Sequence, residues 1–570
     1  MKKTVIQFEN FSFKYRSQAK PTLNDINLTI YEGEKVLIVG PSGSGKSTLG
    51  HCLNGLVPFS YKGEISGSLE IMGEESRNLD IFALSKKVGT VLQDPDGQFI
   101  GLTVAEDIAF ALENDCIPQK QMVDTVIEVS RMVDMENFLD SSLHRLSGGQ
   151  KQRVSLAGVM VDQVDILLFD EPLANLDPAT GKHAIELIDR IQKETETTVV
   201  IIEHRLEDVL HCHVDRIIVI DEGRIVSDQT PDELLASNVL EDCYIREPLY
   251  LKAAKYAGCE VTAEMKPSHL SSFAINGCKD KLVSWFEKTA PPEKKAETPP
   301  ILELCDVSFG YHPDHLTILG ISFSIKRGEM VSIVGKNGAG KSTLSKLICG
   351  FEKLSFGRIL YSGQDITKDT IKERSLRIGM VLQNPNQMIS KHMIYDEVAL
   401  GLIIRGVPEH EVKERVERTL KICGLYPFRN WPISALSFGQ KKRVTIASIL
   451  ALEPEVIILD EPTAGQDFRH YTEMMEFLCE LNRQGITVIM ITHDMHLMLE
   501  YTPRTIVIAG GKKIADDSAV NVLTNSEIIR NANLKETSLF ELALFAEISE
   551  PREFVERFIA FDREVRQKWL

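Results

Sequence analysis

Residues 40–47 of the chain read Gly-Pro-Ser-Gly-Ser-Gly-Lys-Ser, and they directly follow the apolar run from Lys35 to Val39. A buried strand, a glycine-rich loop of this spacing and a helix starting near Ser47 together predict a phosphate-binding loop. The backbone N–H groups of such a loop point at phosphate oxygens at a helix N-terminus, and the lysine adds a cation. This stretch therefore predicts an α/β nucleotide-binding domain.

The same pattern recurs about half a chain length later, where residues 335–342 read Gly-Lys-Asn-Gly-Ala-Gly-Lys-Ser after the run from Met330 to Val334. Two copies in register with further repeated motifs make a chance match untenable. We expect nucleotide contacts from Gly40, Pro41, Ser42, Gly43, Ser44, Gly45, Lys46, Ser47 and Thr48 in the first half, and from Gly335, Lys336, Asn337, Gly338, Ala339, Gly340, Lys341, Ser342 and Thr343 in the second.

A second repeated feature is a continuous apolar run that ends in Asp-Glu-Pro. Residues 165–169 lead into Asp170 and Glu171, and residues 455–459 lead into Asp460 and Glu461. Such runs are typical of fully buried parallel strands. An aspartate at the strand end can hold Mg²⁺ together with the loop serine, and the adjacent glutamate can polarise the attacking water. The expected Mg²⁺ ligands are thus Ser47, Asp170, Ser342 and Asp460, and the expected bases are Glu171 and Glu461.

Strands that alternate with helices in both halves predict an α/β fold with mostly parallel core sheets. Further strands are expected at 5–13, 198–202, 301–309 and 487–491. A proline-bearing stretch at 288–300 suits an extended linker. We therefore expect a first ATPase domain at 1–250, a tail and linker at 251–300, a second ATPase domain at 301–535 and a helical tail at 536–570, in which Phe554, Phe558, Phe561 and Val565 share one helical face that packs on its own domain.

The sequences Leu-Ser-Gly-Gly-Gln at 146–150 and Leu-Ser-Phe-Gly-Gln at 436–440 make the resemblance specific. The chain resembles a tandem ATP-binding-cassette (ABC) ATPase, in which each domain adds an antiparallel β part and a helical signature subdomain to the core sheet. The resemblance implies that ATP and Mg²⁺ lie between one half's phosphate loop and the other half's signature. It assigns Ser147 and Gly149 to the site of Lys341, Ser437 and Gly439 to the site of Lys46, Gln93 and Gln383 to the Q-loops and the metal, His204 and His493 to the γ-phosphate, Tyr15 and Tyr311 to adenine, and Asp177 and Asp467 to the D-loops.

The second signature departs from the pattern, because Phe438 stands where the first has Gly148. Phenylalanine keeps its backbone N–H, but its side chain restricts the left-handed or close-approach geometry that glycine allows. The departure predicts that the site using Lys46 and Glu171 hydrolyses ATP more slowly than the site using Lys341.

The segment after the first Q-loop, Gln-Asp-Pro-Asp-Gly-Gln at 93–98, resembles the energy-coupling-factor branch of ABC importers. Residues 383–389 keep the core of this pattern, whereas Ser390, Lys391 and His392 depart from it. The branch implies an integral-membrane coupling component, a separate membrane component that binds a vitamin or metal ion, and a peripheral position on the cytoplasmic face of the membrane. Fused two-cassette members assigned to thiamine or hydroxymethylpyrimidine uptake are similar, and the cobalt or nickel class stays open.

The composition of the chain narrows the classes of tandem ABC protein to which it can belong. The formal net charge is −18, from 82 acidic and 64 basic residues, which disfavours unspecific binding to nucleic acid. The chain lacks an apolar run of spanning length and an N-terminal signal pattern, and its ten scattered cysteines suit a reducing compartment. A sugar-type tandem importer ATPase, and less readily a soluble tandem ABC protein acting on ribosomes or DNA, stay open. Because both halves lie in one chain, homodimerisation is not required.

Overall fold

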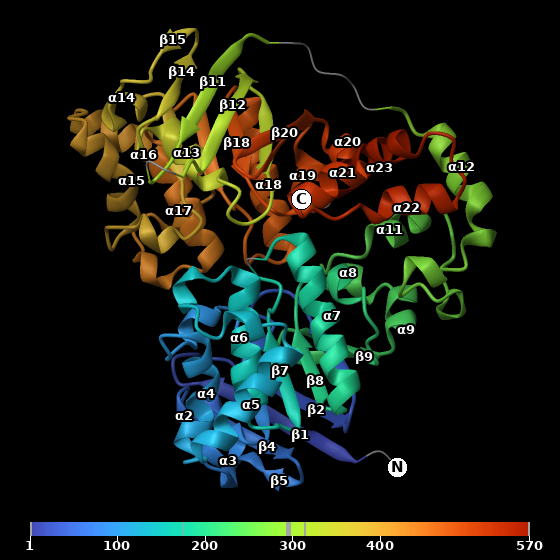
Figure 1. Ribbon diagram of the computed structural model, residues 1–570. Coiled ribbons are helices and arrows are strands. Elements are labelled where there is room, and N and C mark those ends of the chain that lie inside the picture. The colour runs from blue at the N-terminus through green and yellow to red at the C-terminus, as the bar shows by residue number, and fades with distance from the viewer. Residues whose placement is uncertain (1–2, 175, 292–297, 313–314, 568–570) are drawn as a thin grey trace. The chain divides into compact units, whose positions relative to one another are not determined.

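The computed structural model describes all residues except 1–2, 175, 292–297, 313–314 and 568–570. It divides into two compact units, one formed mainly by residues up to Glu287 and the other mainly by residues from Lys288 onward. Six residues of the predicted linker, 292–297, lie outside the described part. Each unit is an α/β domain with two sheets (Figure 1).

The central sheet of the first unit has six strands in the order β10-β9-β3-β8-β7-β6. All neighbours are parallel except β9 and β10. Every residue of β3 and β8 is buried, as expected of strands covered on both faces. The strand bounds are β3 Lys35–Val39, β6 Val88–Val91, β7 Ile166–Asp170, β8 Thr198–Ile202, β9 Arg216–Asp221 and β10 Arg224–Gln229.

An antiparallel sheet in the order β2-β1-β4-β5 packs against this layer across a large apolar core. The helix that follows the phosphate loop, α1, contributes to the same core. The strands are β1 Thr4–Tyr15, β2 Leu23–Tyr31, β4 Gly63–Ile71 and β5 Glu74–Glu75. The helices are α1 Lys46–Leu53, α2 Leu56–Phe59, α3 Ile81–Ser85, α4 Val104–Asn114, α5 Gln119–Met132, α6 Gly148–Met160, α7 Pro178–Thr195, α8 Leu206–Val209, α9 Pro231–Ala236, α10 Val239–Asp242, α11 Leu249–Tyr256 and α12 Lys279–Lys288.

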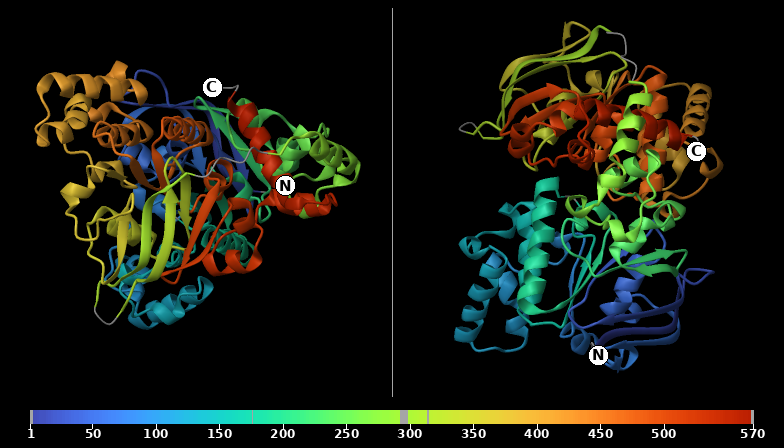
Figure 2. Two further views of the ribbon diagram at one scale, coloured as in Figure 1. Left: turned by 90° about the horizontal axis from the view of Figure 1, so that it is seen from above. Right: turned by 90° about the vertical axis from the view of Figure 1, so that its right-hand side faces the viewer.

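The second unit repeats this plan. Its six-stranded sheet runs β16-β17-β18-β13-β19-β20, with only the β19–β20 pair antiparallel, and its antiparallel sheet runs β12-β11-β14-β15. In Figure 2 the antiparallel strands (yellow-green) lie beside the orange and red core strands. The strands are β11 Pro300–Phe309, β12 Ile318–Lys326, β13 Met330–Val334, β14 Phe356–Tyr361, β15 Gln364–Asp365, β16 Ile378–Val381, β17 Val456–Asp460, β18 Thr487–Ile491, β19 Arg504–Ala509 and β20 Lys512–Asp517.

The second unit's helices include a C-terminal group that packs on its own domain. Phe554 and Phe558 are fully buried, and α23 contacts α19 and α20, which confirms the predicted packing of the helical stripe. The bounds are α13 Lys341–Cys349, α14 Ile371–Arg374, α15 Ile394–Ile404, α16 Glu409–Ile422, α17 Phe438–Leu450, α18 Phe468–Arg483, α19 Met495–Tyr501, α20 Ala519–Leu523, α21 Ser526–Ala532, α22 Ser538–Phe545 and α23 Pro551–Gln567. Within the described residues no helix is both long and apolar enough to cross a membrane.

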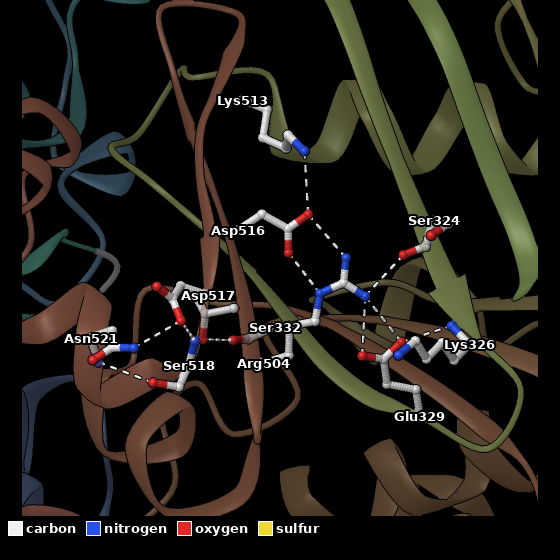
Figure 3. Close-up of polar contacts among 11 residues, drawn as sticks. Ser324, Lys326, Glu329, Ser332, Arg504, Lys513, Asp516, Asp517, Ser518 and Asn521 are labelled. Carbon is white, nitrogen blue, oxygen red and sulfur yellow. Dashed lines mark hydrogen bonds and ion pairs between the residues drawn. The ribbon is translucent and has the colours of Figure 1, made fainter. Parts of the chain in front are cut away.

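An arginine at the start of β19 joins the two sheets of the second unit (Figure 3). Arg504 donates to both carboxylate oxygens of Asp516 on β20, at 2.6 and 2.9 Å, to Glu329 at 3.1 Å and to the carbonyl of Ser324 on β12 at 2.9 Å. Because charge-assisted and bidentate hydrogen bonds are the strong ones, this contact fixes the antiparallel sheet against the core sheet.

Arg216 occupies the matching place in the first unit. It donates to Asp228 on β10, to Glu34 before β3 and to the carbonyl of Thr29 on β2. The two units therefore share this sheet-to-sheet connection, which holds the strand that leads into each phosphate loop.

Candidate functional site

The first phosphate loop has the backbone that its glycines predict. Gly43 and Gly45 have φ of 79° and 106°, in the left-handed region that favours glycine, and Gly45 directly precedes α1. The ammonium of Lys46 donates to the carbonyls of Gly40 and Pro41, each at 2.8 Å. Burial lowers the pKa of Lys46 to about 8. The loop thus encloses its lysine and presents the N-terminus of α1.

The second loop repeats this geometry. Lys341 donates to the carbonyls of Gly335 and Lys336 at 2.7 and 3.1 Å, and Gly338 and Gly340 have φ of 78° and 102°. A Cβ at Gly335 would lie 2.0 Å from the carbonyl oxygen of Ile508, so the loop can rest on the end of β19 only with glycine there.

Polar atoms at the first loop fit a phosphate and a metal ion. The Ser44 hydroxyl and Oδ1 of Asp170 are buried, and in the described part of the chain neither has a hydrogen-bond partner. Buried polar atoms of this kind require a partner, and a loop hydroxyl and a carboxylate oxygen suit a phosphate and Mg²⁺. Burial, together with neighbouring Glu171, raises the pKa of Asp170 to about 6.

The corresponding metal-ligand candidates of the second half lie in contact. The Ser342 hydroxyl donates to Oδ2 of Asp460 at 3.1 Å. Burial and the adjacent Glu461 raise the pKa of Asp460 above its usual value. A bound cation would offset the repulsion between the carboxylates of Asp460 and Glu461. The Ser342 hydroxyl and the Asp460 carboxylate therefore also fit Mg²⁺.

In the first half the predicted base, Q-loop glutamine and histidine come together. Oε1 of Glu171 lies 2.9 Å from Nε2 of His204, and Oε2 accepts from Nε2 of Gln93 at 2.6 Å. Burial alone would raise the pKa of Glu171, but the hydrogen bond and charge of His204 overcome this and lower it. Glu171 also has φ of 50°, a conformation uncommon outside glycine, which marks a sharp turn at the end of β7.

In the second half the base contacts the matching histidine but has a different second partner. Oε1 of Glu461 lies 2.7 Å from Nδ1 of His493, and Oε2 accepts from the hydroxyl of Thr492 at 3.2 Å. Glu461 has φ of 46°, so the turn after the strand is the same. The backbone and the histidine contact are therefore repeated, whereas the second partner of the glutamate is Gln93 in the first half and Thr492 in the second. Gln383 is connected to the Asp460–Glu461 turn through Lys442: the backbone carbonyl of Gln383 accepts a hydrogen bond from the Lys442 ammonium, which also donates to the carbonyl of Asp460.

The two signatures begin helices. Ser147 and Ser437 cap α6 and α17, and each forms a reciprocal capping box with the glutamine three residues later. The prediction that Phe438 restricts a left-handed backbone needed at this position is wrong, because the position is not left-handed in either half. Phe438 and Gly148 are each the first residue of a helix, and neither has positive φ. The Phe438 side chain is 45% exposed, so the substitution changes the surface rather than the fold.

The glycine that precedes the last residue of each signature, Gly149 or Gly439, is packed more closely in the first half than in the second. A Cβ at Gly149 would lie 2.4 Å from Cγ2 of Thr180, whereas a Cβ at Gly439 would meet nothing within 4 Å. Glycine is thus required by packing at the first position only.

The two predicted adenine platforms lie beside their own loops. The Tyr15 hydroxyl lies 3.0 Å from that of Thr48 on α1, and the Tyr311 hydroxyl lies 3.4 Å from that of Thr343 on α13. Asp177 caps α7 by accepting from the N–H of Thr180, and Asp467 directly precedes α18. Roles in nucleotide binding and catalysis stay predictions for all of these residues.

Sequence reasoning missed two buried charged residues. Glu203 accepts from the backbone N–H groups of His204, Arg205 and Leu173 at 2.7, 3.2 and 3.0 Å. Lys442, on α17, is fully buried against backbone carbonyls, and burial lowers its pKa to about 8. A signal existed in each case, because the repeats differ at these positions: Thr492 matches Glu203, and Gln152 matches Lys442.

Comparison with known proteins identifies the family. The sequence profile of the ABC transporter family matches residues 23–174 and 318–464, which hold both phosphate loops and both Asp-Glu pairs. The chain belongs to the ABC transporter family. This ABC protein is therefore a tandem ATP-binding subunit, and its family binds and hydrolyses ATP. A second profile, described as an ATP-binding cassette cobalt transporter, matches residues 237–309.

Relatives of the ABC protein extend over its whole length. A Clostridium perfringens protein, provisionally assigned as an ABC transporter ATP-binding protein, is 61% identical over 99% of this chain and all of its own. An Enterococcus faecalis protein with the same description is 59% identical over 99% of this chain and all of its own. A Vibrio parahaemolyticus relative is 54% identical over 99% of this chain and 98% of its own.

Among solved structures, cbiO1 from Clostridium perfringens, described as part of the ABC transporter complex cbiONQ, is 37% identical. It covers 44% of this chain and 99% of its own, with a TM-score of 0.39.

Proposed function

We propose that the chain is the ATP-hydrolysing, energy-coupling subunit of an importer of the energy-coupling-factor type. The observation that carries the proposal is the cobalt-transporter profile at residues 237–309, in a chain that has two intact phosphate loops. The family and the tandem arrangement support an ATP-driven transporter, and the profile favours this branch over a sugar-type importer.

The proposed chemistry follows from the contacts within each half. The loop amides and Lys46 or Lys341 hold the phosphates of ATP, and Glu171 or Glu461 orients water for attack on the γ-phosphate. His204 and His493 lie against these glutamates and hold their carboxylates toward the loop. Ser47, Asp170 and Gln93 in one half, and Ser342, Asp460 and Gln383 in the other, would hold Mg²⁺. When bound, that ion neutralises charge that develops on the phosphate.

The family resemblance further suggests that the signature of each half completes the nucleotide site of the other. In this proposal Ser147 and Gly149 serve ATP at Lys341, and Ser437 and Gly439 serve ATP at Lys46. ATP would draw the halves together, and hydrolysis would release them. One chain would then contain the whole clamp.

A surface for a membrane partner follows the first Q-loop. Ile100 and Leu102, at the end of the 93–103 segment, are 62% and 80% exposed, although both are large and apolar. The backbone there is fixed, since Oδ1 of Asp107 accepts from the N–H groups of Ile100 and Gly101 at 2.9 and 3.0 Å. A fixed loop that holds apolar side chains in water is typical of a binding surface.

The second half fixes the same segment with Glu397, whose Oε2 accepts from the N–H groups of Ser390 and Lys391 at 2.9 and 2.7 Å. Its exposed apolar residues lie instead at the end of α15, where Ile403 and Ile404 are 61% and 76% exposed. We infer that the two halves meet different parts of an integral-membrane coupling component, on the cytoplasmic face of the membrane. A separate membrane component would bind the solute, which we assign to the vitamin class, thiamine or hydroxymethylpyrimidine, or to cobalt or nickel.

A co-purification experiment tests this proposal. Leu102→Glu should abolish recovery of integral-membrane proteins with the tagged full chain and leave the ATPase rate of the soluble chain unchanged. Val226→Glu is the matched control, because Val226 is 48% exposed on β10, at the opposite edge of the sheet from β6 and the Q-loop. Recovery of ribosomes or nucleic acid in place of membrane proteins would overturn the proposal. Uptake assays with labelled thiamine, hydroxymethylpyrimidine, cobalt and nickel would then identify the solute.

A further inference from the structure

A lysine inside the second domain contacts both segments that hold its proposed catalytic groups. Lys442 lies on α17 and is fully buried. Its ammonium donates to the carbonyls of Leu382 and Gln383 at 2.7 and 2.8 Å, and to the carbonyl of Asp460 at 3.3 Å. The carbonyl of Glu461 lies 3.5 Å away. These carbonyls lie at the ends of the adjacent parallel strands β16 and β17: Leu382 and Gln383 follow β16, Asp460 is the last residue of β17 and Glu461 follows it.

The chemistry of lysine suits this place. An ammonium has three donors and no acceptor, so a set of converging carbonyls can satisfy it completely. A buried charge is costly unless it is hydrogen-bonded in this way, and packing alone would favour an apolar side chain. The pairing of β16 with β17 ends at Val381 and Leu459, so the residues whose carbonyls accept from Lys442 come just after the last paired residues of these two strands. Lys442 therefore holds two chain segments that the sheet itself no longer pairs.

The first domain provides an internal comparison. Gln152 occupies the matching position on α6, and its amide nitrogen donates to the carbonyl of Pro172. Its Oε1 is buried and, among the residues that the structure describes, has no partner. The Q-loop glutamine of that half, Gln93, instead donates from its side chain to Glu171. The two halves thus hold their Q-loops in different ways.

We propose that Lys442 is a positioning residue, which fixes the Q-loop at Gln383 against the Asp460–Glu461 turn and joins both to the helix that begins at the second signature. The inference rests on the proposed function for the roles of these residues in the nucleotide site. In the proposed role Lys442 contacts backbone carbonyls alone and does not touch the nucleotide or the attacking water. It makes the Q-loop, the Asp-Glu turn and the signature helix of the second half move as one body through a single buried side chain. In the first half these parts are joined instead by two separate contacts, Gln93 to Glu171 and Lys151 of α6 to Asp96.

Hydrogen exchange of the full chain tests the proposal directly. Lys442→Met keeps the length of the side chain and removes its charge and donors. We expect amide exchange in residues 383–389 to rise on the order of tenfold, with the core strand β13 unchanged. Gln152→Met is the matched control and should leave exchange in residues 93–98 unchanged. Unchanged exchange in 383–389 of Lys442→Met would overturn the proposal.

Kinetics separate positioning from a general structural role. Lys442→Met should lower kcat for ATP hydrolysis on the order of tenfold, the scale typical of residues that orient a site's ligands, and change KM for ATP less than about twofold. Lys442→Gln, which copies the first half, should fall between Lys442→Met and the native chain, and also covers the case in which Lys442→Met fails to fold. A parallel loss in kcat, KM and melting temperature would indicate only loss of packing and would contradict the proposal.

The two proposals can fail separately. If the native chain couples to no membrane protein but Lys442→Met still loosens residues 383–389, the proposed function is wrong and the positioning role stands. If transport is confirmed and exchange does not change, the positioning role is wrong.

Discussion

The two proposed catalytic glutamates share a backbone and differ in their surroundings. Both adopt positive φ directly after a buried strand, and each carboxylate contacts the histidine that follows the next strand of its sheet. Glu171 is held by His204 and Gln93, and Glu461 by His493 and Thr492. Near Glu171, moreover, lies the buried carboxylate of Glu203, and its charge contributes to the raised pKa of Asp170. Some of the positions at which the repeats differ, Glu203 and Thr492 among them, therefore lie beside the proposed catalytic glutamates.

These differences predict unequal hydrolysis. Glu461→Gln should lower steady-state turnover on the order of 10²-fold or more, because a glutamine cannot accept the proton of the attacking water. Glu171→Gln should lower turnover less, since we expect its site to hydrolyse ATP more slowly in the native chain. Phosphate release measured at saturating ATP checks this.

Binding of a fluorescent ATP analogue serves as the control, because neither variant removes a phosphate contact and affinity should persist in both. Equal losses of turnover in the two variants would contradict the asymmetry.

At the level of single residues, motif spacing was enough to predict the two loops, the Asp-Glu pairs and the histidines. Their neighbours in the chain are strand ends, and parallel strands end at one edge of a sheet. Glu203 and Lys442 were not predictable in the same way. Each is held by backbone N–H or carbonyl groups of distant segments, and backbone atoms leave no trace in residue identity.

At the level of elements, Arg504 and Arg216 decide how the two sheets of each unit are held. Arg504→Met should destabilise the second domain by about 1–3 kcal/mol, the cost of leaving the partly buried carboxylates of Asp516 and Glu329 without their hydrogen-bond donor. Arg216→Met should destabilise the first domain in the same way. Calorimetry of the full chain should show the transition of one domain shifting in each variant, with the other unchanged. A shift of both transitions in either variant would contradict this assignment.

The partner of Arg504 makes this effect depend on pH. Burial acts to raise the pKa of Asp516, but hydrogen bonds and charge from Arg504 and Lys513 lower it below its usual value. A carboxylate whose folded pKa is depressed contributes stability that is fully present above its unfolded pKa, about 3.9, and is lost as pH falls through the folded pKa.

Comparison of the native chain with Asp516→Asn checks this. The difference in melting temperature between the two should be constant from pH 7 to about 5 and should shrink below about pH 4. A difference that grows on acidification would show that the Asp516 carboxylate does not carry the contact.

Most core strands were predictable because they are short, continuous apolar runs with buried residues throughout. The predicted run 198–202 is β8, and 487–491 is β18. The order of the strands was not predictable, since no local pattern says that β3 lies between β8 and β9. Residues 231–288 also escaped a detailed prediction, because their helices are short and their apolar periodicity brief.

At the level of the whole molecule, the duplication predicts two nucleotides per chain. Calorimetric titration of the Glu171→Gln/Glu461→Gln variant, which suppresses hydrolysis, should give a stoichiometry near two. Adding Lys46→Ala or Lys341→Ala should remove one nucleotide each, because each loses the cation that faces the β- and γ-phosphates. Lys336, which follows Gly335 in the second loop, offers a control. Lys336→Ala should keep both sites, since the loop is expected to contact phosphate through backbone N–H groups, which this substitution retains together with the carbonyl that accepts from Lys341. A stoichiometry of one before any lysine is changed would contradict the duplication of function.

Two pairs of matching positions, Glu203 with Thr492 and Gln152 with Lys442, limit which residues can be exchanged between the halves. With the first half's glutamine at position 442, the carbonyls of Leu382 and Gln383 would lose their ammonium. With the second half's threonine at position 203, the backbone N–H groups of Leu173, His204 and Arg205 would lose their carboxylate. Both halves match one family profile, yet at these positions their residues are not interchangeable.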